Sequence, residues 1–214
     1  MGLGDPPSAD RLHRLLDLYP GTRFKLDPTR AWSEALIREL AALSAVDTLD
    51  FKGVYRSGFG EPADPALYRR IAETFPEAWL EDPGLGDPAA DEALKPHRDR
   101  ITWDAPIHSV ADIEALPFPP RTLNFKPSRF GSLRRLFDAY DYCAERGIGI
   151  YGGGQFELGA GRGQIQLLAS LFHPDGPNDV APTAYNEAAP GPGLPQSPLE
   201  PPIARAGLVA ADTP

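Results

Sequence analysis

Five charged residues each follow a short apolar stretch of the chain. They are Asp27, Asp50, Glu81, Asp104 and Lys126, and successive members are 22 to 31 residues apart. That interval is about the length of one strand, turn and helix, so each charge is expected at the C-terminal end of its own strand. A parallel barrel brings such ends together on one face, whereas an open sheet spreads them along a line. The spacing therefore favours a barrel with a charged face.

Three of these carboxylates, those of Asp50, Glu81 and Asp104, are expected on neighbouring strands. Carboxylates held close together repel one another, and a hard cation such as Mg²⁺ relieves the repulsion because it prefers oxygen ligands. Such a cation also binds a substrate carboxylate and stabilises the enediolate that forms when the α-proton leaves. Lys126 is then a candidate acid or base, since lysine amines beside divalent cations are readily deprotonated. Taken singly, each acid has the simpler interpretation of a helix cap or turn residue.

The segments between these charges alternate between two hydrophobic patterns. Six short apolar runs are expected as strands, at residues 23–26, 48–51, 78–80, 101–103, 122–125 and 148–151. Helical patterns lie between them: Thr29, Asp64 and Ser132 are expected as helix caps, and a last helix is expected near 158–172. Alternating strands and helices imply parallel strands joined by right-handed crossovers, which is an α/β fold.

The net charge and the cysteine count of the chain indicate which partners and which cellular compartment to expect. The chain has 214 residues and a formal net charge of −9. An acidic surface repels nucleic acid and anionic membranes, so neither is an expected partner. Cys143 is the single cysteine, so an intrachain disulfide is excluded and a cytoplasmic location is the simplest expectation. Residues 187–214 are rich in proline and are expected to form a loose C-terminal tail.

Short runs at the predicted strand ends resemble the barrel domain of the enolase superfamily, and in particular its mandelate racemase and muconate-lactonizing subgroup, which includes o-succinylbenzoate synthases. They read Leu-Asp-Phe at 49–51, Trp-Leu-Glu-Asp-Pro at 79–83, Trp-Asp at 103–104 and Asn-Phe-Lys-Pro at 124–127. The resemblance implies an incomplete (β/α) TIM-type barrel over residues 1–186.

The resemblance also implies an activity and a cofactor. The activity is that of a lyase or isomerase that abstracts the proton α to the carboxylate of a small substrate, with Mg²⁺ as cofactor. The implied Mg²⁺ ligands are Asp50, Glu81 and Asp104, and Lys126 is the implied acid–base lysine.

Two departures from the family pattern leave the group opposite Lys126 open. The second barrel strand of the family usually ends Lys-x-Lys, where this sequence has Lys-Leu-Asp at 25–27. The third usually reads Asp-x-Asn, where this sequence has Asp-Phe-Lys at 50–52. Asp27 is one candidate base. Lys52 is either a substituted catalytic lysine or an ion-pair partner of Asp27.

A glycine-rich segment, residues 151–163, follows the predicted seventh strand of the barrel. In the barrel interpretation this loop lies at the mouth of the site, where Gln155 and Glu157 are expected to face the substrate. Lys25 is a third expected substrate-binding residue. The alternative is that the glycines only permit close packing there.

Family members begin with an α+β capping domain, and the resemblance implies that this cap and the first barrel strand are missing here. The first helical pattern, formed by Leu12, Leu15, Leu16 and Leu18, leads directly into the Lys-Leu-Asp strand. A barrel that lacks a strand exposes two sheet edges, so a homo-oligomer is among the expectations. Three hypotheses follow: a Mg²⁺-dependent enzyme that is weakly active or inactive in this form, a non-catalytic relic that needs another chain to complete it, and an unrelated α/β protein with acidic caps.

Overall fold

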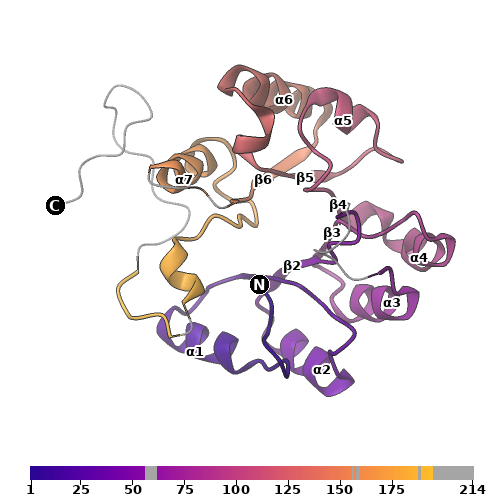
Figure 1. Cartoon of the computed structure of the whole chain (residues 1–214), viewed down its shortest axis with the longest axis vertical. Helices are drawn as coiled ribbons and strands as arrows, with labels where there is room; N and C mark the ends of the chain where they lie inside the picture. Colours follow the sequence, from indigo (N-terminus) through magenta and orange to yellow (C-terminus); the bar gives the residue numbers. More distant parts are fainter. Residues whose placement is uncertain (56–61, 156, 158–159, 188, 195–214) are drawn as a thin grey trace. The chain divides into compact units, whose positions relative to one another are not determined.

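The computed structural model describes residues 1–55, 62–155, 157, 160–187 and 189–194. The chain divides into two compact parts, Met1–Pro106 and Ile107–Pro214, which we call the N-terminal and the C-terminal part. Both consist of parallel strands and helices that alternate along the chain (Figure 1). The predicted tail, 187–214, lies mostly outside the described residues.

The N-terminal part contains a four-stranded parallel sheet whose strands follow the order of the chain. They are β1 (Phe24–Leu26), β2 (Val46–Asp50), β3 (Trp79–Glu81) and β4 (Ile101–Thr102). The helices are α1 (Asp10–Leu18), α2 (Glu34–Ala42), α3 (Pro65–Thr74) and α4 (Pro88–Leu94), and α4 runs into a 3-10 helix, η1 (Lys95–Arg100). Helices α2, α3 and α4 lie on one side of the strands (Figure 1). This is the arrangement that the alternating pattern predicts.

The register of this sheet separates apolar from polar side chains. Residues paired across neighbouring parallel strands point to the same face of a sheet, and the next residue along each strand points to the other. One row consists of Leu26, Leu49, Leu80 and Ile101, all of them fully buried. The row above it contains Asp50, Glu81 and Thr102. The apolar row anchors the strands, and the alternation places the acids on the opposite face.

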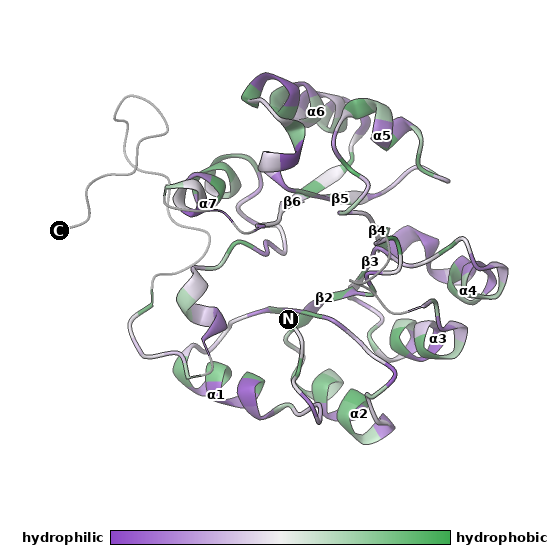
Figure 2. Ribbon diagram, in the orientation of Figure 1, coloured by the Kyte–Doolittle hydropathy of each residue, from purple (hydrophilic) through white to green (hydrophobic). Residues whose placement is uncertain are grey.

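Local capping explains where most of the helices begin. The side chain of Asp64 accepts N–H groups at the start of α3, and Pro65 occupies the first turn of that helix. The predicted cap Thr29 is wrong, because Ser33 caps α2 by accepting the Leu36 N–H at 3.2 Å. The helices carry hydrophobic and hydrophilic residues on different faces (Figure 2). In α3 the buried residues are Leu67, Tyr68, Ile71 and Ala72.

The C-terminal part contains two parallel strands, β5 (Thr122–Phe125) and β6 (Gly149–Gly152). Its α-helices are α5 (Val110–Glu114), α6 (Leu133–Arg146) and α7 (Gly161–Phe172), and two 3-10 helices are η2 (Pro127–Phe130) and η3 (Thr183–Asn186). Ser132 caps α6 as predicted, and Gly147 ends it in the left-handed region at φ 65°. Residues 158 and 159, at the predicted start of the last helix, lie outside the described residues.

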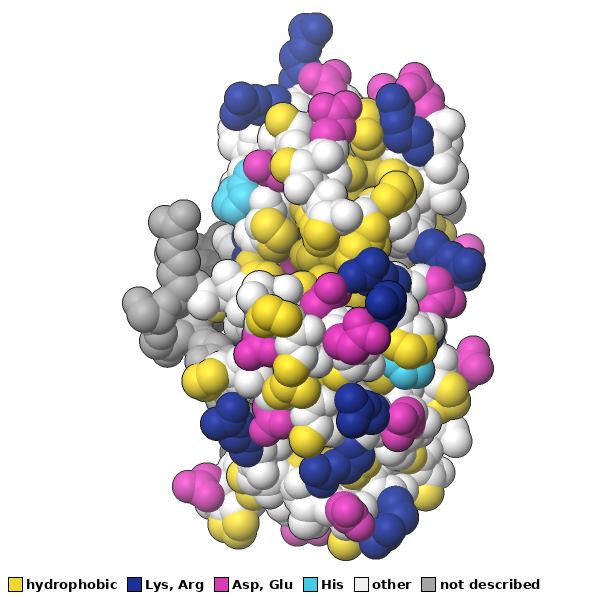
Figure 3. Space-filling view, turned by 90° about the vertical axis from the view of Figure 1, so that its right-hand side faces the viewer, with side chains coloured by type: hydrophobic (Ala, Val, Ile, Leu, Met, Phe, Trp, Pro, Cys, Tyr) yellow, Lys and Arg dark blue, Asp and Glu magenta, His cyan; other side chains and the backbone are white. Residues whose placement is uncertain are grey.

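The surface carries mixed charges. On the face shown in Figure 3, acidic and basic side chains are interspersed. Arg98 pairs with Asp91 at 2.7 Å, and Lys95 pairs with Glu92 at 3.2 Å. Such exposed pairs add little stability. Among the described residues, no helix is long and apolar enough to cross a membrane.

Candidate metal centre

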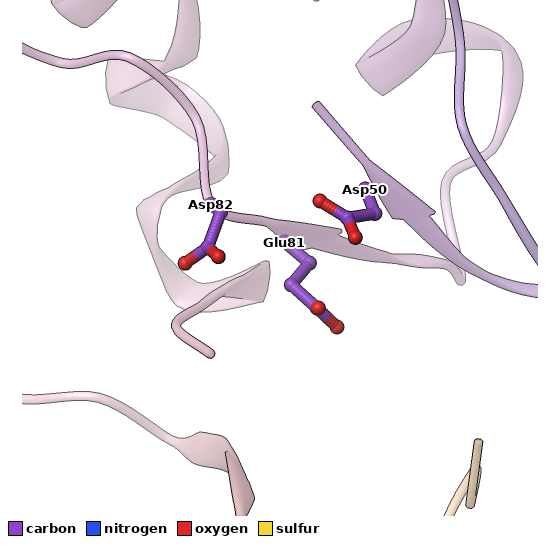
Figure 4. A group of neighbouring side chains, drawn as sticks. All are labelled: Asp50, Glu81 and Asp82. Atoms are coloured by element: carbon purple, nitrogen blue, oxygen red, sulfur yellow. The ribbon is translucent and has the colours of Figure 1, made fainter. Parts of the chain in front are cut away.

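Three acidic side chains converge at the C-terminal ends of β2 and β3. Asp50 is the last residue of β2, Glu81 is its register partner at the end of β3, and Asp82 follows directly (Figure 4). Each offers a carboxylate oxygen that lies within 4.8 Å of the other two, and all three residues are buried. The structure therefore brings two of the three predicted ligands, Asp50 and Glu81, into one group.

Burial and mutual repulsion raise the pKa values of two acids in this group. Burial raises the pKa of Glu81 to about 8; Lys25 opposes this shift, and the nearby charges of Asp50 and Asp104 add to it. Burial likewise raises the pKa of Asp82 to about 7, and the charges of Asp104 and Asp50 contribute. At neutral pH and without a bound cation, these raised pKa values mean that Glu81 and Asp82 tend to hold protons. Buried carboxylates that repel one another in their charged forms fit a hard divalent cation, which relieves the repulsion when it takes the place of the protons.

Asp82 is a candidate site residue that the spacing of the strand ends did not indicate. Its Oδ1 accepts the backbone N–H of Asp104 at 2.9 Å, and its Oδ2 accepts the N–H of Ala105 at 2.9 Å. Its backbone lies in the left-handed region at φ 47°. Asp82 thus clasps the segment that follows β4. The only signal in the sequence was an acid between a buried strand and Pro83.

Asp104, the third predicted ligand, follows β4 and is fully buried. Its carboxylate accepts the hydroxyl of Tyr55 at 3.3 Å. The group of three acids with oxygens within 4.8 Å of one another contains Asp82 instead of Asp104. Asp104 nevertheless lies near enough for its charge to act on both Glu81 and Asp82. Its role as a ligand stays a prediction.

Lys25 and Lys52 make two separate sets of ion pairs beside the acids. The ammonium group of Lys25 contacts Glu81 Oε1 and lies 3.2 Å from Asp50 Oδ2. The ammonium group of Lys52 lies 2.6 Å from Asp27 Oδ2. Of the two alternatives for Lys52, the pairing with Asp27 is the contact that is present.

Asp27 is held as a carboxylate. Burial alone raises its pKa, but the positive charges of the amino terminus, Lys52 and Lys25 outweigh that effect, so the net pKa lies below its usual range. The amino group of Met1 contacts Asp27 Oδ1 at 3.3 Å. A carboxylate held in its charged form and paired with an ammonium group is a weak base.

The remaining predicted site residues lie in the C-terminal part. Lys126 follows β5 and is mostly buried, and its carbonyl accepts the Arg129 N–H at 2.9 Å. Gly153, at the end of β6, passes close to it: a Cβ atom at Gly153 would lie 2.9 Å from Lys126 Cε and 2.4 Å from Asn124 Oδ1. The absence of a side chain at Gly153 therefore makes room for Lys126 and Asn124.

The other two, Gln155 and Glu157, are joined to each other. The Gln155 N–H donates to Glu157 Oε1 at 2.6 Å, and Glu157 Oε2 pairs with Arg162 at 3.4 Å. Arg162 Nε also donates to the carbonyl of Ala181 at 2.9 Å. Glu157 thus ties the glycine-rich loop to α7. A substrate-binding role for either residue stays a prediction.

Comparisons with known proteins agree with this architecture. A family model described as "Domain of unknown function (DUF8230) C-terminal domain" matches residues 1–187. An o-succinylbenzoate synthase of Geobacillus kaustophilus is 28% identical over 194 residues, which are 86% of this chain and 50% of that protein. An o-succinylbenzoate synthase of Bacillus subtilis is 34% identical over 106 residues, which are 48% of this chain and 29% of that protein. The chain therefore spans half the length, or less, of these two relatives.

Solved structures show the same fold. A probable mandelate racemase from Alicyclobacillus acidocaldarius matches with a TM-score of 0.63 and 23% identity, over 93% of this chain and 57% of that one. A member of the enolase superfamily from Listeria innocua matches with a TM-score of 0.59 and 23% identity, over 79% of this chain and 46% of that one. The predicted fold, an incomplete α/β barrel of the enolase C-terminal domain kind, is confirmed.

Proposed function

We propose that this chain, which belongs to the family of the DUF8230 C-terminal domain, forms the metal-binding and acid–base part of a lyase or isomerase that removes the proton α to a substrate carboxylate. The observation that carries the proposal is the pairing of Asp50 with Glu81, which places two buried carboxylates side by side at the ends of neighbouring strands. The names of the two relatives, both o-succinylbenzoate synthases, support the reaction class. The resemblance to enolase-superfamily barrels supports the site's position at the strand ends.

The donor set suits Mg²⁺, which prefers carboxylate oxygens and keeps several water ligands. Asp50 and Glu81 would hold the ion, and Asp104 is the proposed third ligand. Asp82 is the less suitable third ligand, because both of its oxygens already accept backbone N–H groups. When bound, the ion would offset the negative charge that develops on the substrate as its proton leaves.

The acid–base groups of the proposal are Lys126 and a residue from the N-terminal part. The ion pair with Lys52 favours the charged form of Asp27. Lys52 is the proposed proton donor, and Asp27 is proposed to position its ammonium group. Gln155 and Glu157 would contact the substrate. These roles rest on the family resemblance together with the ion pair.

A non-catalytic chain that needs another chain to complete it is the second candidate. The ion pairs of Lys25 and Lys52 favour it, because both amines already have carboxylate partners within the chain. Such a protein would keep the cluster of Asp50, Glu81 and Asp82 for a structural role. Metal binding without proton exchange would support this candidate.

The test is exchange of the α-proton in D₂O, followed by proton NMR, with small carboxylic acids that carry a C–H next to the carboxylate. The chain with Mg²⁺ is expected to exchange this proton, and a chelator is expected to stop the exchange. Asp50→Asn and Lys126→Met should lower the rate by about 100-fold or more, the usual effect of removing an acid–base or metal-binding group. Lys95→Met, at the exposed start of η1, is the control. Exchange that survives in Asp50→Asn would refute the proposal.

A further inference from the structure

Lys25 occupies the oxygens that a metal ion would need. Its side chain is 10% exposed, and its ammonium group contacts Glu81 Oε1 and lies 3.2 Å from Asp50 Oδ2. These are the two carboxylates that hold the ion in the proposed function. Lys25 is thus a cation of this chain placed at the position where a second cation is proposed to bind.

The remaining oxygen of Asp50 is already engaged. Asp50 Oδ1 accepts the backbone N–H of Lys52 at 3.0 Å, and this contact orients the carboxylate. Oδ2, the oxygen on the Lys25 side, is therefore the one left to turn towards a metal ion. An ammonium group and a divalent ion that share buried oxygens repel each other strongly, because burial lowers the screening between their charges.

We propose that Lys25 is a tethered cation that competes with the divalent ion for Asp50 and Glu81, and that metal binding moves its ammonium group off these oxygens and onto the carboxylate of the substrate. The inference rests on the proposed function, because it assumes the same metal centre. The long, flexible lysine stem permits the movement. A buried ammonium group that has lost its partners is costly, so the displaced Lys25 favours binding of an anion. Metal and substrate would then bind in a fixed order, metal first.

The chain offers a matched control for this competition. Lys52 carries the same charge, lies next to the acids and makes the same kind of ion pair, but its partner is Asp27 and not one of the proposed ligands. Removing either lysine changes the net charge by the same amount. A difference in Mg²⁺ affinity between the two variants therefore reports the contact of Lys25 with the proposed ligand oxygens, and not the loss of one positive charge near the site.

The experiment is calorimetric titration of Mg²⁺ into the wild-type chain, Lys25→Met and Lys52→Met at one pH and ionic strength. The Kd for Mg²⁺ is expected to be at least tenfold lower in Lys25→Met than in the wild type, and to change less than threefold in Lys52→Met. Succinate, as a carboxylate probe, is expected to bind the wild type only when Mg²⁺ is present, and to bind metal-loaded Lys25→Met at least tenfold more weakly.

A second measurement covers the case in which Lys25→Met folds poorly without metal. Its Tm is then followed against Mg²⁺ concentration by circular dichroism, and it should rise by more than that of the wild type. A Kd that is unchanged or higher in Lys25→Met, with Mg²⁺ still bound by the wild type, would overturn this inference and leave the proposed function standing. Absence of Mg²⁺ binding in the wild type and in both variants would overturn the two together.

Discussion

Asp82 holds Asp104 through the backbone: the carboxylate at the end of β3 accepts the Asp104 N–H at 2.9 Å, while its other oxygen accepts the N–H of Ala105 at the same distance. The link connects two neighbouring strand ends just where the acids converge. The position of Asp104, after β4, therefore depends on Asp82, which follows β3. The clasp therefore couples the stability of the segment to the geometry of the candidate metal centre.

Asp82→Asn is expected to break half of this clasp. An amide side chain offers one acceptor oxygen and one N–H₂ group, so one of the two backbone N–H groups would face a donor. Leaving a buried donor without an acceptor costs about 1–3 kcal/mol of the free energy of unfolding. Asparagine tolerates the left-handed backbone at this position, so the change isolates the hydrogen bond. Urea denaturation measures the loss.

The control for this change is Asp17→Asn, on the exposed side of α1, which removes the same charge. It is expected to alter the free energy of unfolding by less than about 0.5 kcal/mol. Equal stability of Asp82→Asn and the wild type would contradict the clasp.

Gly153→Ala is expected to disturb Lys126 directly. The added Cβ would lie 2.4 Å from Asn124 Oδ1 and 2.9 Å from Lys126 Cε. Asn124 is fully buried, so the clash should lower the free energy of unfolding by about 1–3 kcal/mol. It should also shift the side chain of Lys126. Thermal unfolding gives the stability, and proton exchange gives the effect on Lys126.

Gly163 provides the matched control for Gly153. It lies within α7, and a Cβ atom there would meet nothing within 4 Å. Gly163→Ala is therefore expected to be neutral or to stabilise the helix by up to about 1 kcal/mol. If Gly153→Ala also stabilised the protein, Asn124 and Lys126 would lie farther from Gly153 than the structure places them.

The stability of the C-terminal part should depend on His173. Its Nδ1 donates to Asn178 Oδ1 at 2.7 Å, because the Asn178 amide donates to the carbonyls of His173 and Gly176 and so turns its oxygen to the ring. Its Nε2 then accepts the hydroxyl of Tyr140 at 3.3 Å, which fits a neutral imidazole. Burial lowers the pKa of His173 below its usual value.

The sign of the pH effect follows from that shift. Below the usual histidine pKa of about 6.5, the unfolded chain binds a proton more readily than the folded chain does. The contribution of His173 is therefore fully present above this pH and is lost as the pH falls through the lowered folded value. The wild type should lose more stability between pH 7.5 and pH 5 than His173→Gln does. Parallel curves of Tm against pH for the two proteins would disprove the role of His173.

The sequence was sufficient for the strands and for placing Asp50 and Glu81 at the ends of neighbouring strands. Both follow from apolar runs that recur at the length of one strand and helix, because such runs must be buried and their ends must align. The cap of α2 was predicted at Thr29 and lies at Ser33, since hydroxyl residues occur at both positions and only the packed helix selects between them.

The contacts of Asp82 and Lys25 could not be predicted in the same way. Asp82 acts through backbone N–H groups more than 20 residues away, and any residue type except proline would supply those groups. The bridge from Lys25 to Glu81 crosses from β1 over β2 to β3, so it depends on the register of three strands. Sequence spacing gives the order of the strands but not these registers.

The ion pair formed by Asp27 and Lys52 allows the two roles of Lys52 to be separated. Both side chains are partly exposed, at 23% and 32%, so their coupling in a double-mutant cycle with Asp27→Asn and Lys52→Met should be about 0.5–1 kcal/mol. Lys52→Arg keeps the charge and the ion pair but removes an amine that can give up its proton. If Lys52 donates a proton in the reaction, this variant should keep the wild-type Tm and lose proton exchange by about 100-fold or more. If Lys52 only pairs with Asp27, exchange in Lys52→Arg should stay within threefold of the wild type, and Asp27→Asn should reduce stability without a matching loss of exchange.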